Sequence, residues 1–148
     1  MKIAVSACLL GVPCRFDGQA RPCEAVKALA SRHELVRVCP ESGAGLRIPR
    51  SPNEIVAAEE KLRVVDSDGV DHTEAFVKGA RRALERAQEA GCELAILKSK
   101  SPSCGNGLIY DGTFTGMLVE GWGVAARMFR DAGIHVIDEN IVQELCGS

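Results

Sequence analysis

At residues 94–105 the chain reads Leu94-Ala95-Ile96-Leu97-Lys98-Ser99-Lys100-Ser101-Pro102-Ser103-Cys104-Gly105. The first four residues form a short apolar run, which is typical of a strand buried in a parallel sheet. The rest is a polar loop whose backbone N–H groups and hydroxyls are available to a ligand. The charges of Lys98 and Lys100 favour the thiolate form of Cys104. We therefore expect a sheet edge at which Cys104 forms one corner of a site.

Strand-like and helix-like segments alternate on both sides of this stretch. We expect strands at residues 2–7, 34–39, 62–65, 92–98, 107–111 and 134–137. We expect helices at 22–32, 53–60, 73–90, 122–132 and 140–146, loops at 42–52 and 113–121, and a small hairpin at the turn 66–69. The alternation predicts an α/β fold, a mostly parallel sheet with helices on both faces in a Rossmann-like three-layer sandwich. No repeat or boundary interrupts it, so residues 1–148 are expected to form a single domain.

The composition excludes several classes of protein. A hydrophobic content of 46% argues against disorder, and a net charge of −2 without a basic stripe argues against a nucleic-acid duplex as partner. We expect no membrane association, because no apolar run is long enough to cross a bilayer. The apolar part of the N-terminus is too short for a signal peptide and is better interpreted as a first strand. The partner we expect is a small molecule.

Seven cysteines are a high and odd count for 148 residues. Without a secretion signal, a disulfide framework is not expected, and the cytoplasm is the default compartment. Many thiols in that compartment indicate metal, cluster or thiol chemistry. Cys92 and Cys146 are expected to be small buried residues of a strand and a terminal helix.

Three other cysteines each follow an apolar strand: Cys8, Cys39 and Cys104. The carboxyl ends of parallel strands meet at one edge of a sheet, where ligands bind, so these thiols are expected to share a crevice. Cys14 lies in the loop after the first strand and can reach the same place. Three thiolates could hold a metal ion or a [4Fe–4S] cluster with one position open, but the spacing alone favours structural or redox thiols. There is no Cys-x-x-Cys pair to decide between them.

Several polar residues accompany these thiols. Glu41 is a candidate general acid or base, or else a loop carboxylate paired with an arginine such as Arg50. Arg50 can anchor a carboxylate or carbonyl group of a substrate. Ser101 and Ser103 can donate hydrogen bonds to a substrate or to sulfide, or they can simply cap the turn. Lys98 can offset negative charge and contact the substrate, or it can be solvated.

Five motifs occur in order along nearly the whole chain: Ser6-Ala7-Cys8-Leu9-Leu10-Gly11, Cys14-Arg15-Phe16-Asp17-Gly18, Val38-Cys39-Pro40-Glu41, Gly45-Leu46 with Pro49-Arg50, and the stretch from Leu97 to Gly105. The set resembles the bacterial family known as domain of unknown function 523, which includes thiouracil desulfidases. Each motif alone is weak, and the specificity comes from the set. Family members often have Gly-Gly-Leu and Pro-x-Pro-Arg where this chain has 44–46 and 47–50, which bears on the substrate more than on the cofactor.

The resemblance implies an α/β fold and a [4Fe–4S] cluster held by Cys8, Cys39 and Cys104. It implies that the iron without a protein ligand binds the sulfur of a thiolated base, that sulfide is taken up there, and that water supplies the replacing oxygen without net redox chemistry. By position, Glu41 matches a proton-transfer residue. One of the serines of the Cys104 loop, Ser101 or Ser103, matches a positioning residue.

Two other functions use the same thiols. A protein that carries a cluster or sulfur to a partner would need the cysteines but not Glu41. A thiol redox protein would use Cys8 and Cys14 as attacking and resolving thiols.

Overall fold

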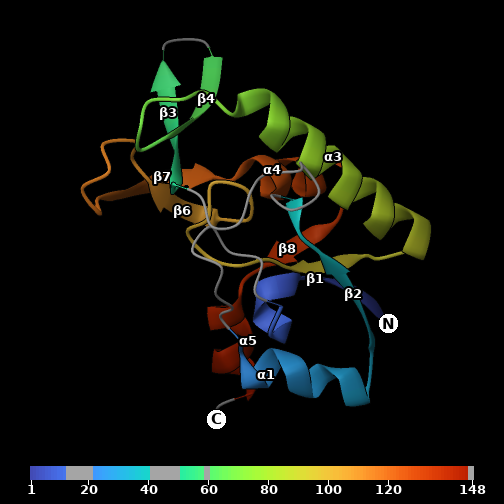
Figure 1. The fold of residues 1–148 in the computed structure, drawn as a ribbon. Helices are drawn as coiled ribbons and strands as arrows, with labels where there is room; N and C mark the ends of the chain where they lie inside the picture. The colour runs from blue at the N-terminus through green and yellow to red at the C-terminus, as the bar shows by residue number, and fades with distance from the viewer. Residues whose placement is uncertain (13–21, 41–50, 59–60, 147–148) are drawn as a thin grey trace.

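The computed structural model describes residues 1–12, 22–40, 51–58 and 61–146 (Figure 1). Its centre is a parallel sheet of four strands in the order β2-β1-β5-β8. These strands are β1 (Lys2–Ser6), β2 (Glu34–Val38), β5 (Leu94–Ile96) and β8 (His135–Ile137). The α/β prediction is therefore confirmed, and each of these strands lies within one residue or two of its expected position.

Strand β1 lies in the middle of the sheet because its residues are apolar on both faces. Ala4 and Val5 are completely buried and Ile3 nearly so. Val5 pairs with Arg37 of β2 on one side and with Ile96 of β5 on the other. A continuous apolar run of this kind is what a strand covered on both faces requires.

Helices cover both faces of the sheet (Figure 1). On one face lie α3 (Thr73–Ala90) and α4 (Val124–Asp131), which pack on each other. On the other face lie the short helices η1 (Ala7–Leu10), α1 (Glu24–Lys27), η2 (Ala28–Ser31) and α5 (Glu139–Cys146). Two separate apolar clusters fill the layers on either side of the sheet. The predicted three layers are thus present.

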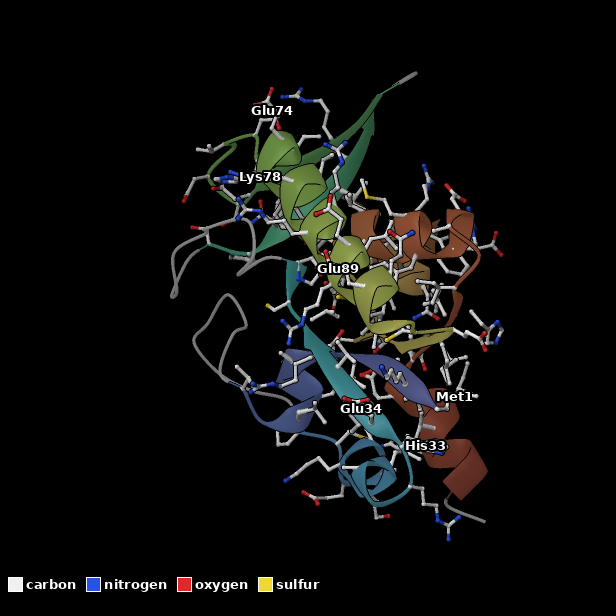
Figure 2. All side chains as sticks on the ribbon, turned by 90° about the vertical axis from the view of Figure 1, so that its right-hand side faces the viewer. Met1, His33, Glu34, Glu74, Lys78 and Glu89 are labelled. Atoms are coloured by element: carbon white, nitrogen blue, oxygen red, sulfur yellow. The ribbon has the colours of Figure 1, made fainter. Side chains whose placement is uncertain are left out.

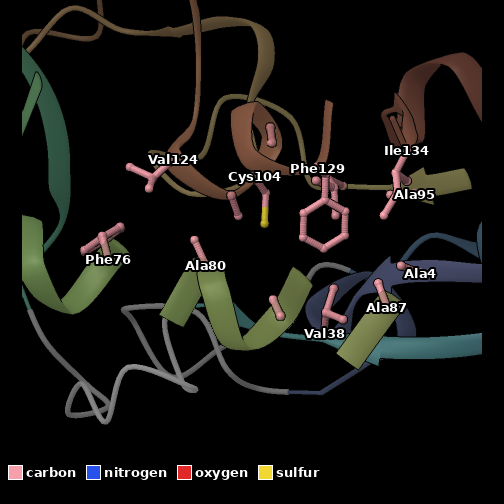
Figure 3. Packing of buried hydrophobic residues seen from close by; sticks show 14 of the residues in the cluster. Ala4, Val38, Phe76, Ala80, Ala87, Ala95, Cys104, Val124, Phe129 and Ile134 are labelled. Atoms are coloured by element: carbon pink, nitrogen blue, oxygen red, sulfur yellow. The ribbon is translucent and has the colours of Figure 1, made fainter. Parts of the chain in front are cut away.

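Helix α3 has the bounds that the sequence predicts. Its buried face consists largely of alanines, including Ala80 and Ala87, which allow close approach to the sheet and to α4 (Figure 3). Charged residues such as Glu74, Lys78 and Glu89 project from its outer face (Figure 2). No helix in the part of the chain that the structure describes is both long and apolar enough to span a bilayer.

The prediction of a helix at residues 53–60 is wrong. Residues Asn53–Ala58 form strand β3, which pairs antiparallel with β4 (Lys61–Asp66). Pairing of the β-branched Ile55 with Val64, both buried, outweighs a helical pattern that is short and has no cap. The hairpin therefore comes earlier than predicted, although a bridge between Val65 and Asp71 also closes the turn at 66–69.

The predicted loop at 113–121 is partly wrong, because Leu118–Trp122 form strand β7, which pairs with β6 (Asn106–Tyr110). Gly121 suggested a loop, but a Cβ there would lie 2.7 Å from Cδ1 of Ile109. The glycine is therefore required for close approach within a strand pair. Since Trp122 belongs to β7, helix α4 begins at Val124 rather than at 122. The helix expected at 22–32 is divided into α1 and the 3-10 turn η2.

The Asp71 carboxylate, just before α3, makes the stability of the fold depend on pH. Asp71 accepts hydrogen bonds from the backbone N–H of Thr73 and from Arg63, and bonds to Thr73 and Arg63 lower its pKa from 3.8 to about 2. Its contribution to stability is therefore complete above pH 3.8 and is lost as the pH falls through about 2. The Asp71→Asn variant keeps an oxygen for the Thr73 N–H but carries no charge.

We predict that wild-type protein is more stable than Asp71→Asn at pH 6 and that the difference shrinks steadily as the pH is lowered toward 2.5. Urea midpoints measured by circular dichroism at several pH values test this. A difference that does not change with pH would contradict the role assigned to the carboxylate.

Candidate functional site

A cavity of about 470 Å³ opens at the carboxyl ends of β1, β2 and β5. The strand-end segments 6–8, 38–40 and 98–104 form most of its wall. Residues 52–54 at the start of β3 and Tyr110 at the end of β6 complete it. The parallel sheet thus brings three segments that are distant in sequence to one place, at the edge where such folds bind ligands.

Cys8, Cys39 and Cys104 all line this cavity. Cys8 lies in η1 directly after β1, Cys39 directly after β2, and Cys104 in the loop after β5. Cys8 and Cys104 are buried, whereas Cys39 is partly exposed. Glu41, Arg50 and Cys14 lie outside the described residues.

No group of three His, Cys, Asp or Glu side chains within the described ranges converges tightly enough to hold a single metal ion. A mononuclear site needs all its sulfur ligands about 2.3 Å from one ion. Among the described residues, the three thiols therefore lie on separate walls of one cavity and do not form a mononuclear site.

The Cys104 loop, residues 98–105, is held in place by hydrogen bonds to its backbone. The Oγ of Ser101 accepts hydrogen bonds from the N–H groups of Ser103 and Cys104, both at 3.1 Å. The loop is also fastened to α4, because the N–H of Gly123 donates to the carbonyl of Gly105 at 2.7 Å and that of Val124 donates to Pro102 at 2.9 Å. This loop is therefore a firmly placed part of the cavity wall.

The hydrogen bonds also orient the serine hydroxyls. Because Ser101 Oγ already accepts from two N–H groups, its own proton is left for Ser103 Oγ, which lies 3.0 Å away. Ser103 is almost completely buried, and its Oγ lies 3.7 Å from the sulfur of Cys104. Ser101 therefore caps the turn, which is one of the two roles that the sequence allowed for it.

Lys98 lines the cavity but does not present an isolated charge. Its Nζ lies 3.0 Å from Oε2 of Glu139, which is in the first turn of α5. The carboxylate of Glu139 also accepts hydrogen bonds from the N–H of Ser99 at 2.8 Å and from the Ser99 hydroxyl at 3.2 Å. Glu139 thus orients the ammonium group of Lys98, which the sequence predicts at the site. Nothing in the local sequence around Glu139 indicates this role.

Asn53 and Glu54 also belong to the cavity wall, although the sequence pattern predicts a helix there and gives no sign of this position. Both are buried and line the cavity. Oε1 of Glu54 accepts the N–H groups of Gly112 at 3.0 Å and Phe114 at 3.3 Å, which fastens the β6–β7 turn beside the cavity. Asn53 Oδ1 is buried and has no hydrogen-bond partner among the described residues.

Cys92 has a different environment from the three cavity cysteines. It precedes β5, at the opposite edge of the sheet, and it is buried. Burial raises the pKa of its thiol, so the thiol remains protonated and inert. The prediction that Cys92 is a small buried residue is confirmed. Cys146 ends α5 as expected.

Comparison with known proteins gives three matches. The model of the family described as 2-thiouracil desulfurase matches residues 3–140. An uncharacterised protein of Bacillus subtilis (strain 168), YbbK, is 39% identical over 97% of this chain and 99% of its own length. A solved structure of the [4Fe-4S]-dependent thiouracil desulfidase TudS (DUF523Vcz) superposes with a TM-score of 0.86 at 41% identity and covers 98% of this chain and 95% of that one.

We predict that Glu139→Ala lowers the free energy of unfolding by about 2 kcal/mol, because it leaves a partly buried ammonium and a backbone N–H without their carboxylate. Glu139→Gln should lose less, since its amide oxygen can still accept the N–H of Ser99. Urea unfolding measures both values. Equal losses for the two variants would show that the charge, rather than the hydrogen bonds to Ser99, dominates.

Gly123→Ala should disturb the Cys104 loop. A Cβ at Gly123 would lie 2.5 Å from the carbonyl carbon of Ser103 and 2.8 Å from the nitrogen of Cys104, both backbone atoms. We expect a loss of about 2–3 kcal/mol. The matched control is Gly133→Ala, where φ is +88° and no atom lies within 4 Å of the new Cβ, so only backbone strain of about 1 kcal/mol is expected. Equal effects on unfolding would contradict the close contact with the loop.

Proposed function

The chain belongs to the 2-thiouracil desulfurase family, and we propose from this membership and from the cysteine-lined cavity that it is a [4Fe–4S]-dependent desulfidase. The substrate is a small thiolated base such as thiouracil. The thiocarbonyl and one water molecule give the carbonyl compound and hydrogen sulfide, so no electrons are exchanged with another reactant. The observation that carries the proposal is the meeting of three strand-end cysteines in one cavity.

The donor set of the cavity fits the cluster. Cys8, Cys39 and Cys104 would be its protein ligands, one from each of three neighbouring walls. Three thiolates leave one iron without a protein ligand, and that iron supplies a Lewis acid for the sulfur of the substrate. A cavity of about 470 Å³ is within the usual range for small-molecule sites, which is roughly 300–1,000 Å³.

The chain's own residues bind and orient the substrate and move protons. Lys98 lines the cavity, and its Nζ lies 3.0 Å from Glu139 Oε2 and 3.3 Å from both Ser99 O and Ser99 Oγ. It is proposed to act on the base through its positive charge, and a direct hydrogen bond to the base would replace one of the contacts to Ser99. Arg50 is proposed to contact the substrate as well. Glu41 is proposed to take the proton from the attacking water. Ser101 and Ser103 are proposed to position the substrate from the Cys104 loop. The hydroxyl of Ser101 donates its proton to that of Ser103.

Residues 1–148 are proposed to act as one desulfidase domain in the cytoplasm, where thiols remain reduced. Cys14 is proposed as an additional thiol near the site rather than a ligand.

The first test is iron and acid-labile sulfide analysis of anaerobically reconstituted protein. Wild-type protein should be brown, contain close to four irons and release sulfide from thiouracil. Cys8→Ser, Cys39→Ser and Cys104→Ser should each lose most of the iron and the activity. The matched control is Cys92→Ala, which should keep both because Cys92 lies away from the cavity. Retention of full iron and activity by Cys39→Ser would refute the proposed ligand set, and metal-free protein with a Cys8–Cys14 disulfide would instead support a redox function.

The second test separates catalysis from a carrier function. Glu41→Gln should keep the cluster but lower kcat by roughly 100-fold or more, because a general base contributes about that much. Glu54→Gln is a control, since that carboxylate is engaged by backbone N–H groups of the β6–β7 turn. It should have a much smaller effect on turnover. Unchanged turnover in Glu41→Gln would contradict the role of general base proposed for Glu41. Wild-type protein that holds a cluster but does not turn over thiouracil would favour a carrier that needs only the cysteines.

A further inference from the structure

Ser6 is the last residue of the central strand β1, and its side chain lies between two parts of the site. It is only 3% exposed and lines the cavity. Its Oγ accepts the backbone N–H of Lys98 at 2.8 Å, at the end of β5. The same Oγ lies 3.3 Å from the sulfur of Cys104. One hydroxyl therefore contacts both the strand end and the cysteine of the following loop.

The direction of these two hydrogen bonds follows from the donors present. A backbone N–H can only donate, so Ser6 Oγ must be the acceptor toward Lys98. The proton of the hydroxyl is then left for the Cys104 sulfur. When Cys104 is a thiolate it has no proton of its own and can only accept. Ser6 therefore donates an O–H···S hydrogen bond to Cys104.

The surroundings of the sulfur make this bond important. Cys104 belongs to the apolar cluster between the sheet, α3 and α4, and its sulfur points toward α3 (Figure 3). Besides Ser6 Oγ at 3.3 Å, Ser103 Oγ lies 3.7 Å from this sulfur, so Ser6 is the nearer of two hydroxyls. A negative charge in largely apolar surroundings needs such hydrogen-bond donors, and a hydrogen bond is electrostatically stronger there than in water. Hydrogen bonds to cysteine sulfurs also set the reduction potential of an iron–sulfur cluster.

We propose that Ser6 is a positioning residue for Cys104, whose hydroxyl orients the sulfur and withdraws charge from it when the sulfur binds iron. This inference rests on the proposed function, because it takes Cys104 to be a cluster ligand. It assigns a role to a serine of the first strand, whereas the serines of the Cys104 loop are the ones that the sequence indicates. Sulfur ligands deprived of such a bond are more electron-rich, so the cluster becomes harder to reduce.

Two variants test the proposal. Threonine and valine have the same shape as each other, so Ser6→Thr and Ser6→Val differ only in that threonine keeps the hydroxyl and valine has a methyl group in its place. After anaerobic reconstitution, Ser6→Val should have a more negative [4Fe–4S]²⁺/⁺ reduction potential than wild type. It should lose iron to a chelator roughly tenfold faster, as expected for removal of a hydrogen bond to a metal ligand. Ser6→Thr should resemble wild type in both. Ser99→Ala, which removes a cavity hydroxyl that bonds to Glu139, should leave both readouts unchanged.

The outcomes separate this inference from the proposed function. If Ser6→Val matches Ser6→Thr in potential and iron loss while wild-type protein holds a cluster and desulfurates thiouracil, the role of Ser6 is refuted and the proposed function stands. If wild-type protein holds no cluster, both are refuted. If Ser6→Val does not fold, as judged by circular dichroism, Ser6→Ala replaces it in the comparison with Ser6→Thr.

Discussion

The parallel pairing of β1 with β2 on one side and β5 on the other is the constraint on which the site depends. Ser6 is in register with Val38, and Val5 with Ile96, so the three strands reach the same edge of the sheet together. The residues that follow them must then form the walls of one cavity. A shift of register by one residue would turn every side chain to the other face, so the apolar pattern of β1 also keeps the cavity walls in place.

Small residues make this arrangement possible on the α3 and α4 side. Ala80 and Ala87 of α3 and Ala125 of α4 are completely buried, which allows the helices to approach the sheet and each other closely. Gly123 does the same for the Cys104 loop, because any side chain there would meet the backbone of Ser103 and Cys104. The loop is thus positioned by packing as well as by hydrogen bonds.

Several polar groups of the site each make more than one bond to their neighbours. Glu139 bonds to Lys98 and Ser99, Ser101 bonds to two backbone N–H groups and to Ser103, and Ser6 bonds to Lys98 and the sulfur of Cys104. These bonds join α5, β5, β1 and the Cys104 loop. The site is therefore supported from both faces of the sheet, which explains why helix α5 at the far end of the chain contributes to it.

The sequence by itself determined the parallel sheet, the bounds of α3 and the strand-end position of Cys8, Cys39 and Cys104, because these follow from local apolar patterns and from the rule that parallel strands end at one edge. It did not determine β3 or β7, whose strand form depends on pairing with β4 and β6 rather than on their own residues. Nor did it indicate that Glu139 would orient Lys98 or that Ser6 would reach Cys104, 98 positions away along the chain. Only the tertiary structure decided these contacts, since a hydrogen bond between distant residues leaves no local periodicity.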